Sequence, residues 1–475
     1  MIKFEIDCSE IIRDKILYVI DIFKDYFFYK VSDTKEIIIL YSDKEKNEKY
    51  YDILIKCDPI SKIFYSETAL FSKKNIKYYE YNVENIPFLF HSFSNKLYDY
   101  RSDQNQVVIN VDIFSSAFYF LSLWQEYYSK ERDIHNRYCG KSSLQHGINM
   151  LNKPIVTVYF NIILSILSKH FKINVRDNEV VLALSHDIDY IKKWSLGIIY
   201  RETVQYFLLN KKKELLRKRV ERLKYFLKAF FDKNDPYRNS FIKMFNYEIK
   251  NGIRSTYFFK SGTTSRHDVS YSLKNKFLLK MVSELKEKDF DIGLHPSYNA
   301  YNNETIMQKE LFKLKEVTGI DRLGVREHFL RYDVKSTPMI HSNLNFIYDS
   351  SLGYHDLEGY RTGYSFPHKL FDLKNNKTLN IIEVPLVIMD STLEYYHNLD
   401  TGKAKAVIQQ MINRLKNYGG ILTLLIHNTC YDDLDYKGWG ILYEEIVKYS
   451  LDENISIKSI KDSLYYFNKS GKYQK

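Results

Sequence analysis

The stretch LALSHDIDYIKKW, residues 182–194, decides the fold. It begins with an apolar run of the kind that forms a buried strand, and His186, Asp187 and Asp189 follow directly. These side chains are costly to bury unless each has a partner or a ligand. A strand that ends in such groups indicates a functional edge of a sheet.

Similar apolar or β-branched runs recur through the second part of the chain, most of them separated by helix-length segments. They are VVLALS (180–185), STYFF (255–259), DIGL (291–294), RLGV (322–325), NFIY (345–348), NIIEVPLVIM (380–389) and ILTLLI (421–426). Runs that are apolar throughout are typical of parallel strands covered by helices. The pattern predicts an α/β fold whose parallel sheet is either closed as a barrel or open and doubly wound.

Polar side chains stand just beyond six of these runs. They are His186, Asp187 and Asp189; His295; Arg326 and His328; Asp349; Asp390; and His427. Any single one of them could be a loop or capping residue. Because the carboxyl ends of parallel strands lie at one rim of a barrel, we expect the six tips to converge there.

The 475 residues favour two domains rather than one. Residues 1–175 contain strand-like runs such as EIIILYS (36–42) and a helical pattern over 112–133, without a concentration of catalytic residues. We therefore expect a smaller N-terminal α/β domain over 1–175 and the main domain over 176–475.

The formal net charge of +11 is concentrated in one place, since residues 201–230 hold ten Lys or Arg and three Glu. Their apolar residues recur at helical intervals, which predicts a basic amphipathic helix within an insertion at about 197–248. A solvated surface helix is the first interpretation. Contact with an anionic membrane surface or a lipid-linked glycan is the second, and nucleic-acid binding is not expected because no recognition module accompanies the helix.

The start of the chain lacks the apolar core of a signal peptide, and no later run approaches bilayer-spanning length, so we expect a cytoplasmic protein. The four cysteines form no CxxC pair, which argues against a thiolate zinc site or a disulfide scaffold.

The polar tips predict metal-assisted hydrolysis of an amide or ester. Asp189 and His295 offer the oxygen and nitrogen donors that suit Zn²⁺, with Co²⁺ and Ni²⁺ as alternatives. Asp187 is the candidate general base for a water molecule, and Arg326 is expected to orient and ionise it. His427 is the candidate acid for the leaving group.

These segments resemble the polysaccharide deacetylases of carbohydrate esterase family 4, through SHDID, HPSYN, GVREHFLRYD and LTLLIHN. The resemblance implies a distorted (β/α)7 barrel over most of 176–475. It also implies Asp187 as the base, Asp189 and His295 as metal ligands, and His427 as the acid supported by Asp390.

Asn299 stands where the family has its second histidine ligand, so the resemblance implies Asn299 as the third metal ligand. If Pro296 opened a helix, residues 295 and 299 would lie one turn apart on one side. An amide oxygen is a weaker ligand than an imidazole, which leaves room for help from His186 or His328.

A closer resemblance is to a bacterial subgroup in which an N-terminal domain of unknown function precedes the deacetylase domain. It is carried by DIFSSAFYFLSLWQEYYSKERDIHNRY, NDPYRNSF, DSSLGYHDLEGYRTG and EVPLVIMDSTL, and it implies Tyr360, Arg361 and Asp390 near the sugar. The expected activity is metal-dependent removal of N-acetyl groups from an amino sugar of a bacterial surface polysaccharide or its precursor. The alternatives are hydrolysis of another amide or ester, such as an O-acetyl group, and an inactive glycan-binding or assembly protein.

Overall fold

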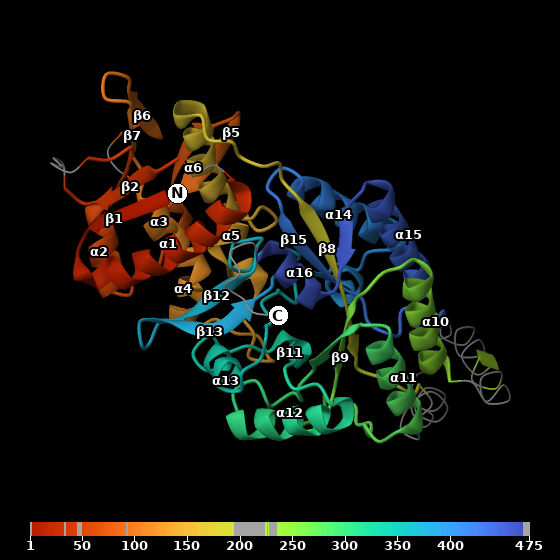
Figure 1. The fold of residues 1–475 in the computed structure, drawn as a ribbon. Helices are drawn as coiled ribbons and strands as arrows, with labels where there is room; N and C mark the ends of the chain where they lie inside the picture. Colours follow the sequence, from red (N-terminus) through yellow and green to blue (C-terminus); the bar gives the residue numbers. More distant parts are fainter. Residues whose placement is uncertain are drawn as a thin grey trace.

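The computed structural model describes residues 2–32, 35–44, 50–91, 94–193, 224–225, 227 and 235–468. Two main sheets organise these residues, one built from strands before residue 110 and one from strands after residue 179 (Figure 1). The division into domains 1–175 and 176–475 is retained as a proposal.

The N-terminal region is an α/β unit around a five-stranded sheet of order β1-β2-β3-β7-β6, parallel except for β6. Its strands are β1 (Ile2–Asp7), β2 (Ile37–Ser42), β3 (Ile53–Lys56), β6 (Tyr98–Arg101) and β7 (Gln106–Ile109), with a separate hairpin of β4 (Lys77–Tyr81) and β5 (Glu84–Phe88). Its helices are α1 (Glu10–Lys30), α2 (Pro59–Ser66), α3 (Ile113–Leu121), α4 (Trp124–Tyr128), α5 (Leu144–Gly147) and α6 (Ile155–Phe171), with 3-10 turns η1 (Lys73–Asn75) and η2 (Gly140–Ser142).

The helical pattern predicted over 112–133 is divided into α3 and α4. Asp112 caps α3 by accepting a hydrogen bond from the backbone N–H of Ser115, and all nine residues of α3 are buried. Leu123 then adopts a left-handed backbone with φ of 55°, which ends the first helix and lets Trp124 begin the second.

The second sheet is centred on β8 (Val180–Ile188), in which eight of nine residues are buried. One edge of β8 pairs in parallel with β15 (Gly420–Leu425), and the other pairs first with β16 (Ser456–Lys458) and then with β9 (Thr256–Phe259). Neighbours on both edges and helices around the sheet explain why its first five residues are all apolar, while His186 and Asp187 lie near the end of the same strand.

The sheet curls into a barrel that is closed by single bridges. From β9 it continues through β10 (Asp291–Leu294) and β11 (Gly324–Val325), and Val325 then pairs with Asp349 and Asp349 with Glu383. Glu383 ends β13 (Lys377–Glu383), and the chain runs on into β14 (Leu386–Met389), which pairs with β15. The predicted fold class, a distorted barrel of the α/β type preceded by a smaller α/β region, is confirmed.

One detail differs from the sequence prediction. The run NFIY forms no strand of its own: Ile347 and Tyr348 hydrogen-bond to Leu323 and Val325, and Asp349, which follows the run, bridges Val325 and Glu383.

The basic stretch 201–230 lies almost wholly outside the described residues, so its helix stays a prediction. Of the predicted insertion at about 197–248, the structure describes residues 224–225, 227 and 235–248, which include most of α10 (Pro236–Lys250).

The remaining elements surround the barrel (Figure 1). They are α11 (Lys276–Glu287), α12 (Glu304–Thr318), the 3-10 turn η4 (His328–Leu330), α13 (Thr337–Asn343), β12 (His368–Asp372), the π-helical turn η5 (Thr392–Tyr396), α14 (Thr401–Leu415), α15 (Trp439–Asp452) and α16 (Ile460–Phe467).

The N-terminal region packs against the barrel through buried contacts. The hairpin of β12 and β13 lies beside α1, where the Tyr18 hydroxyl donates to the carbonyl of Lys369 over 2.8 Å (Figure 1). Arg361 forms a bidentate ion pair with Glu126 of α4, at 2.6 and 3.0 Å.

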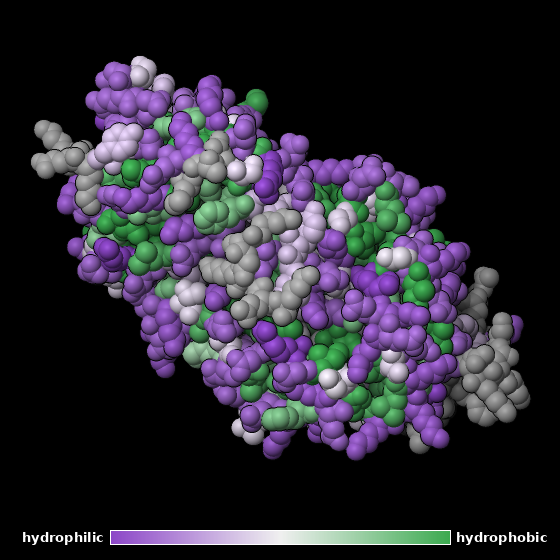
Figure 2. Space-filling model, viewed as in Figure 1, coloured by the Kyte–Doolittle hydropathy of each residue, from purple (hydrophilic) through white to green (hydrophobic). Residues whose placement is uncertain are grey.

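Hydrophilic residues cover most of the face shown in Figure 2. Among the described residues, no helix combines the length and apolarity needed to cross a membrane.

Candidate metal centre and active site

The strand ends converge on one pocket of about 460 Å³. β8 contributes Asp187 and Asp189, and the tips of later strands contribute side chains from the other parts of the rim. The lining includes Asp187, Asp189, His295, His328, Asp390 and His427. Five of the six predicted tips therefore meet in this pocket, whereas Asp349 does not line it and contacts His341 and Ser351 instead.

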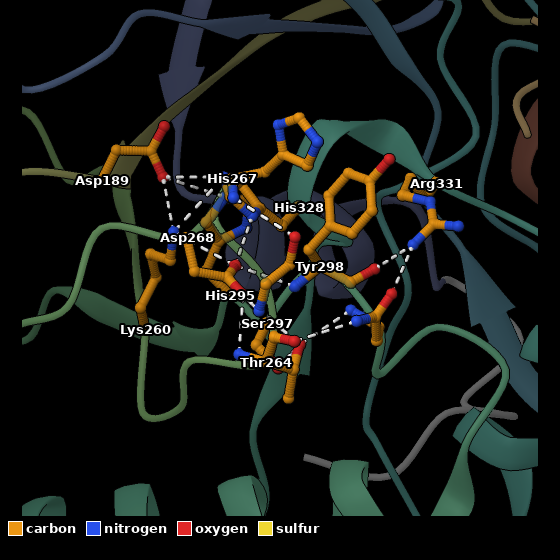
Figure 3. Close-up of polar contacts among 12 residues, drawn as sticks. Asp189, Lys260, Thr264, His267, Asp268, His295, Ser297, Tyr298, His328 and Arg331 are labelled. Atoms are coloured by element: carbon orange, nitrogen blue, oxygen red, sulfur yellow. Dashed lines mark hydrogen bonds and ion pairs between the residues drawn. The ribbon is translucent and has the colours of Figure 1, made fainter. Parts of the chain in front are cut away.

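Asp189, His295 and His328 form a cluster of possible metal ligands, with donor atoms that all lie within 4.8 Å of one another (Figure 3). The Nε2 atoms of His295 and His328 lie 3.5 and 3.6 Å from Oδ1 of Asp189. Within the described part of the chain this is the one group of three or more such side chains with that geometry.

Each histidine of the cluster is oriented by a contact at its other ring nitrogen. His295 Nδ1 lies 2.6 Å from the carbonyl oxygen of Arg326, and His328 Nδ1 lies 3.0 Å from Oδ1 of Asp268. Since a carbonyl and a carboxylate accept hydrogen bonds, both Nδ1 atoms donate. The Nε2 of each ring faces Asp189, and that of His328 also lies 3.3 Å from Nζ of Lys260. Burial lowers the pKa of His328 to about 4, which keeps its ring neutral.

The donor set fits a divalent metal ion. Oδ1 of Asp189 is buried without a hydrogen-bond partner among the described residues, although a carboxylate oxygen in such a place needs one. Burial alone would raise the pKa of Asp189. His328, His295 and Lys260 lower this pKa by more than burial raises it, so it lies well below its usual value. One carboxylate and two neutral imidazoles are a common ligand set for catalytic Zn²⁺.

Asn299 does not join this cluster, and the prediction that it is a ligand needs correction. Residues 295–303 form turns rather than a helix, so residues 295 and 299 do not share a helical face. The Asn299 side chain is exposed, donates to the carbonyl of Thr264 and accepts from Arg331. His328 supplies the third donor instead.

His186 also lies outside the cluster, although it belongs to the same strand end. Its ring bridges the carbonyl of Ile426 and the carboxylate of Glu248, at 2.7 and 2.9 Å, and it is fully buried. It therefore stabilises the barrel behind the pocket.

Asp187 lies between the cluster of possible metal ligands and Arg326, as expected for a base that Arg326 orients. Its Oδ2 is 3.7 Å from Nε2 of His295, and its Oδ1 is 3.6 Å from the guanidinium of Arg326. Arg326 is fully buried, and Ser185 and Ser350 accept hydrogen bonds from its other end. The buried guanidinium therefore holds the Asp187 carboxylate in place at the edge of the cluster.

His427 and Asp390 form a hydrogen-bonded pair in the same pocket. Asp390 accepts hydrogen bonds from the backbone N–H of His427 and from its Nδ1, both at 2.7 Å. Burial alone would lower the pKa of His427, but the Asp390 carboxylate raises it to about 10. Nε2 of His427 lies 3.7 Å from Oδ2 of Asp189, so the ring edge faces the metal cluster.

Tyr360 and Arg361 are not in the pocket, and their predicted contact with sugar is not supported. Both are buried where the barrel meets the N-terminal region. The Tyr360 hydroxyl donates to the carbonyl of Ile421, and Arg361 is engaged by Glu126 and by the carbonyl of Gly353.

Several pocket residues escape the sequence reasoning. Lys260 follows β9, Glu394 lies on the π-helical turn, and Arg137 comes from the N-terminal region. Asp268, also after β9, does not line the pocket but contacts His328. Lys260 stands directly at a strand end, so the reasoning that found the other tips could have found it. The other three carry no such positional signal.

Lys260 lies inside the ligand cluster with its side chain buried (Figure 3). Its Nζ is 3.3 Å from Nε2 of His328, 3.8 Å from Oδ1 of Asp189 and 3.7 Å from Oδ1 of Asp268.

Glu394 also lines the pocket, where burial and the neighbouring Asp390 raise its pKa to about 7.

Comparison with known proteins gives three findings. Residues 5–172 match the model of a family of unknown function, DUF7033, which confirms the predicted N-terminal domain of unknown function. No curated protein matches the chain. Several solved structures resemble it at low sequence identity.

Three of these structures have TM-scores of 0.41–0.42. A proposed polysaccharide deacetylase from Mycobacterium smegmatis is 13% identical, over 62% of this chain and 92% of its own. Puue allantoinase is 10% identical, over 62% and 93%, and a proposed polysaccharide deacetylase from Pseudomonas aeruginosa PAO1 is 11% identical, over 63% and 94%. Two of the three are thus described as members of the class that the motifs resemble.

Proposed function

We propose that the chain is a metal-dependent hydrolase that removes N-acetyl groups from an amino sugar of a bacterial surface polysaccharide or its precursor. The observation that carries this proposal is the convergence of a metal-ligand cluster, a paired carboxylate and a paired histidine in one pocket. The sugar substrate is drawn from the resemblance of the motifs to polysaccharide deacetylases.

Asp189, His295 and His328 would hold the ion, which we propose to be Zn²⁺. When bound, such an ion polarises a carbonyl group and lowers the pKa of a water ligand. Asp187 is placed to accept a proton from an attacking water, since its carboxylate lies beside His295 and is paired with Arg326. His427, oriented by Asp390, is placed to give a proton to the departing amine.

The walls of the pocket fit a polar ring-shaped substrate. Tyr190, Tyr395, Tyr396 and Tyr436 line it together with the acidic side chains Glu327 and Glu394. Aromatic faces can pack against a sugar ring while carboxylates accept its hydroxyl hydrogens. The predicted cytoplasmic location belongs to the same proposal.

The direct test is acetate release from N-acetylated amino sugars by the Zn²⁺-loaded chain. Free amine in equal amount to acetate would support N-deacetylation, whereas acetate without amine would show O-acetyl hydrolysis. We expect Asp187→Asn to lose about 10²-fold or more in kcat, the size of effect usual for a general base, while it retains Zn²⁺. Unchanged activity in this variant would contradict the assigned role.

The alternative of an inactive glycan-binding protein rests on Asn299 in the place of a histidine ligand. His328 supplies a third donor, so this substitution no longer favours the alternative. Sugar binding without acetate release across a panel of acetylated glycans would restore it.

A further inference from the structure

We propose that the N-terminal region helps to build the metal centre: Arg137, held by Asp133, positions the turn that carries His328. This inference rests on the metal centre of the proposed function. It assigns a role to residues 133–137, which belong to the part of the chain matched by a family of unknown function.

The turn after His328 has a strained backbone. Phe329 and Leu330 adopt left-handed conformations, with φ of 61° and 53°, and neither is a glycine. Each such residue costs on the order of 1 kcal/mol relative to an ordinary conformation. Two in succession persist only when surrounding contacts hold them, and His328 directly precedes them.

Arg137 supplies such a contact from outside the barrel. Its guanidinium donates to the carbonyl oxygen of Phe329 over 3.0 Å and to the hydroxyl of Tyr396 over 2.9 Å. The same guanidinium is fixed from behind by Asp133, which accepts from Nε and a terminal nitrogen at 2.9 and 2.7 Å. Arg137 itself is 5% exposed, so the guanidinium is largely removed from water.

A second line of contacts runs from the same loop to the other side of His328. His135 Nδ1 lies 2.8 Å from the Tyr298 hydroxyl, and Arg331 donates to the His135 carbonyl over 2.8 Å. The backbone N–H of Tyr298 donates to Asp268, whose same oxygen receives His328 Nδ1 (Figure 3). The loop therefore holds both the turn and the partner of the His328 ring.

The position of a metal ligand depends on such outer contacts, and their removal commonly weakens metal binding 10- to 100-fold. Arg137 does not touch the proposed ion and acts through Phe329, so it is a positioning residue. The expected signature of its loss is weaker metal affinity in a chain that remains folded.

The test is the Zn²⁺ dissociation constant of the full chain, measured by chelator competition in the wild type and in Arg137→Gln and Arg137→Lys. We expect roughly 10- to 100-fold weaker binding in Arg137→Gln. Arg137→Lys should be intermediate, because an ammonium cannot reach Asp133, Phe329 and Tyr396 together. Circular dichroism at the same temperature establishes that each variant is folded.

Arg132→Gln is the matched control, because Arg132 lies in the same loop but donates only to carbonyls of Glu126, Ser129 and Glu131. Its Zn²⁺ affinity should equal that of the wild type. If Arg137→Gln does not fold, Tyr396→Phe removes one anchor of the guanidinium and should weaken binding several-fold. Wild-type affinity in a folded Arg137 variant would overturn the inference alone, whereas a wild type without Zn²⁺ affinity would overturn the proposed function and the inference with it.

Discussion

Single residues decide which of the strand tips become ligands. His186 and His328 both follow an apolar run, and both are buried with one carboxylate partner. The second ring nitrogen of His186 is hydrogen-bonded to a backbone carbonyl, whereas Nε2 of His328 faces Asp189. Sequence position identifies the tips, but the contacts of the second ring nitrogen separate structural histidines from candidate ligands.

Lys260 leads to a prediction at this scale, because a positive charge next to a metal site opposes a divalent cation. At about 4 Å and an effective dielectric constant near 20, two unit charges repel by about 4 kcal/mol, and side-chain rearrangement reduces this. We expect Lys260→Met to bind Zn²⁺ at least about tenfold more tightly than the wild type. Lys260→Arg keeps the charge and should not gain affinity. Weaker binding in Lys260→Met would show that the ammonium supports the site instead.

His341 allows a prediction of how the stability of the fold depends on pH. It lies on α13, with Nδ1 3.0 Å from Asp349 and Nε2 2.8 Å from Glu327, so both ring nitrogens donate to carboxylates. Burial alone would lower its pKa, but Asp349 and Glu327 raise it to about 9. The folded pKa then exceeds the unfolded value of about 6.5.

The stabilisation from His341 is therefore complete below about pH 6.5 and is lost as pH rises through about 9. We expect the difference in unfolding free energy between wild type and His341→Gln to shrink over this window by on the order of 3 kcal/mol. Urea unfolding at a series of pH values measures it. A difference that is constant with pH would mean that His341 is neutral in the folded protein.

At the scale of elements, the strands of the barrel were accessible from the sequence because strands buried on both faces are apolar throughout. β8, β10 and β15 coincide closely with the predicted runs. Asn299 was expected as a ligand because it stands where the family motif has its second histidine, but the turns that precede α12 at Glu304 leave its side chain bonded to Thr264 and Arg331. The loop that holds Asp268 has no periodicity from which its approach to His328 could be inferred.

At the scale of the whole molecule, the buried ion pair of Glu126 and Arg361 joins the N-terminal region to the barrel. Both side chains are almost fully buried, so loss of one partner leaves a charge without compensation. We expect Glu126→Gln to lower the free energy of unfolding by about 3–5 kcal/mol, measured by urea denaturation. Glu126→Leu combined with Arg361→Met should cost less than the single variant. A loss below about 1 kcal/mol in Glu126→Gln would contradict this account.

Contacts between distant parts of the chain were the least accessible from the sequence. Tyr360 and Arg361 stand in a loop rich in polar and aromatic residues, which suits a sugar site as well as an interface. Only the position of Glu126 shows that Arg361 belongs to the interface. The approach of Arg137 to Phe329 joins residues 192 positions apart, and no local pattern predicts it.

The most direct test of the central claim is the metal content of the purified chain, compared among wild type, His328→Ala and Asn299→Ala after the same exposure to Zn²⁺. The cluster of Asp189, His295 and His328 predicts near-stoichiometric metal in the wild type and in Asn299→Ala, and its loss in His328→Ala. Metal that is lost from Asn299→Ala but retained by His328→Ala would contradict the ligand assignment. A wild type without metal would contradict the metal centre as a whole.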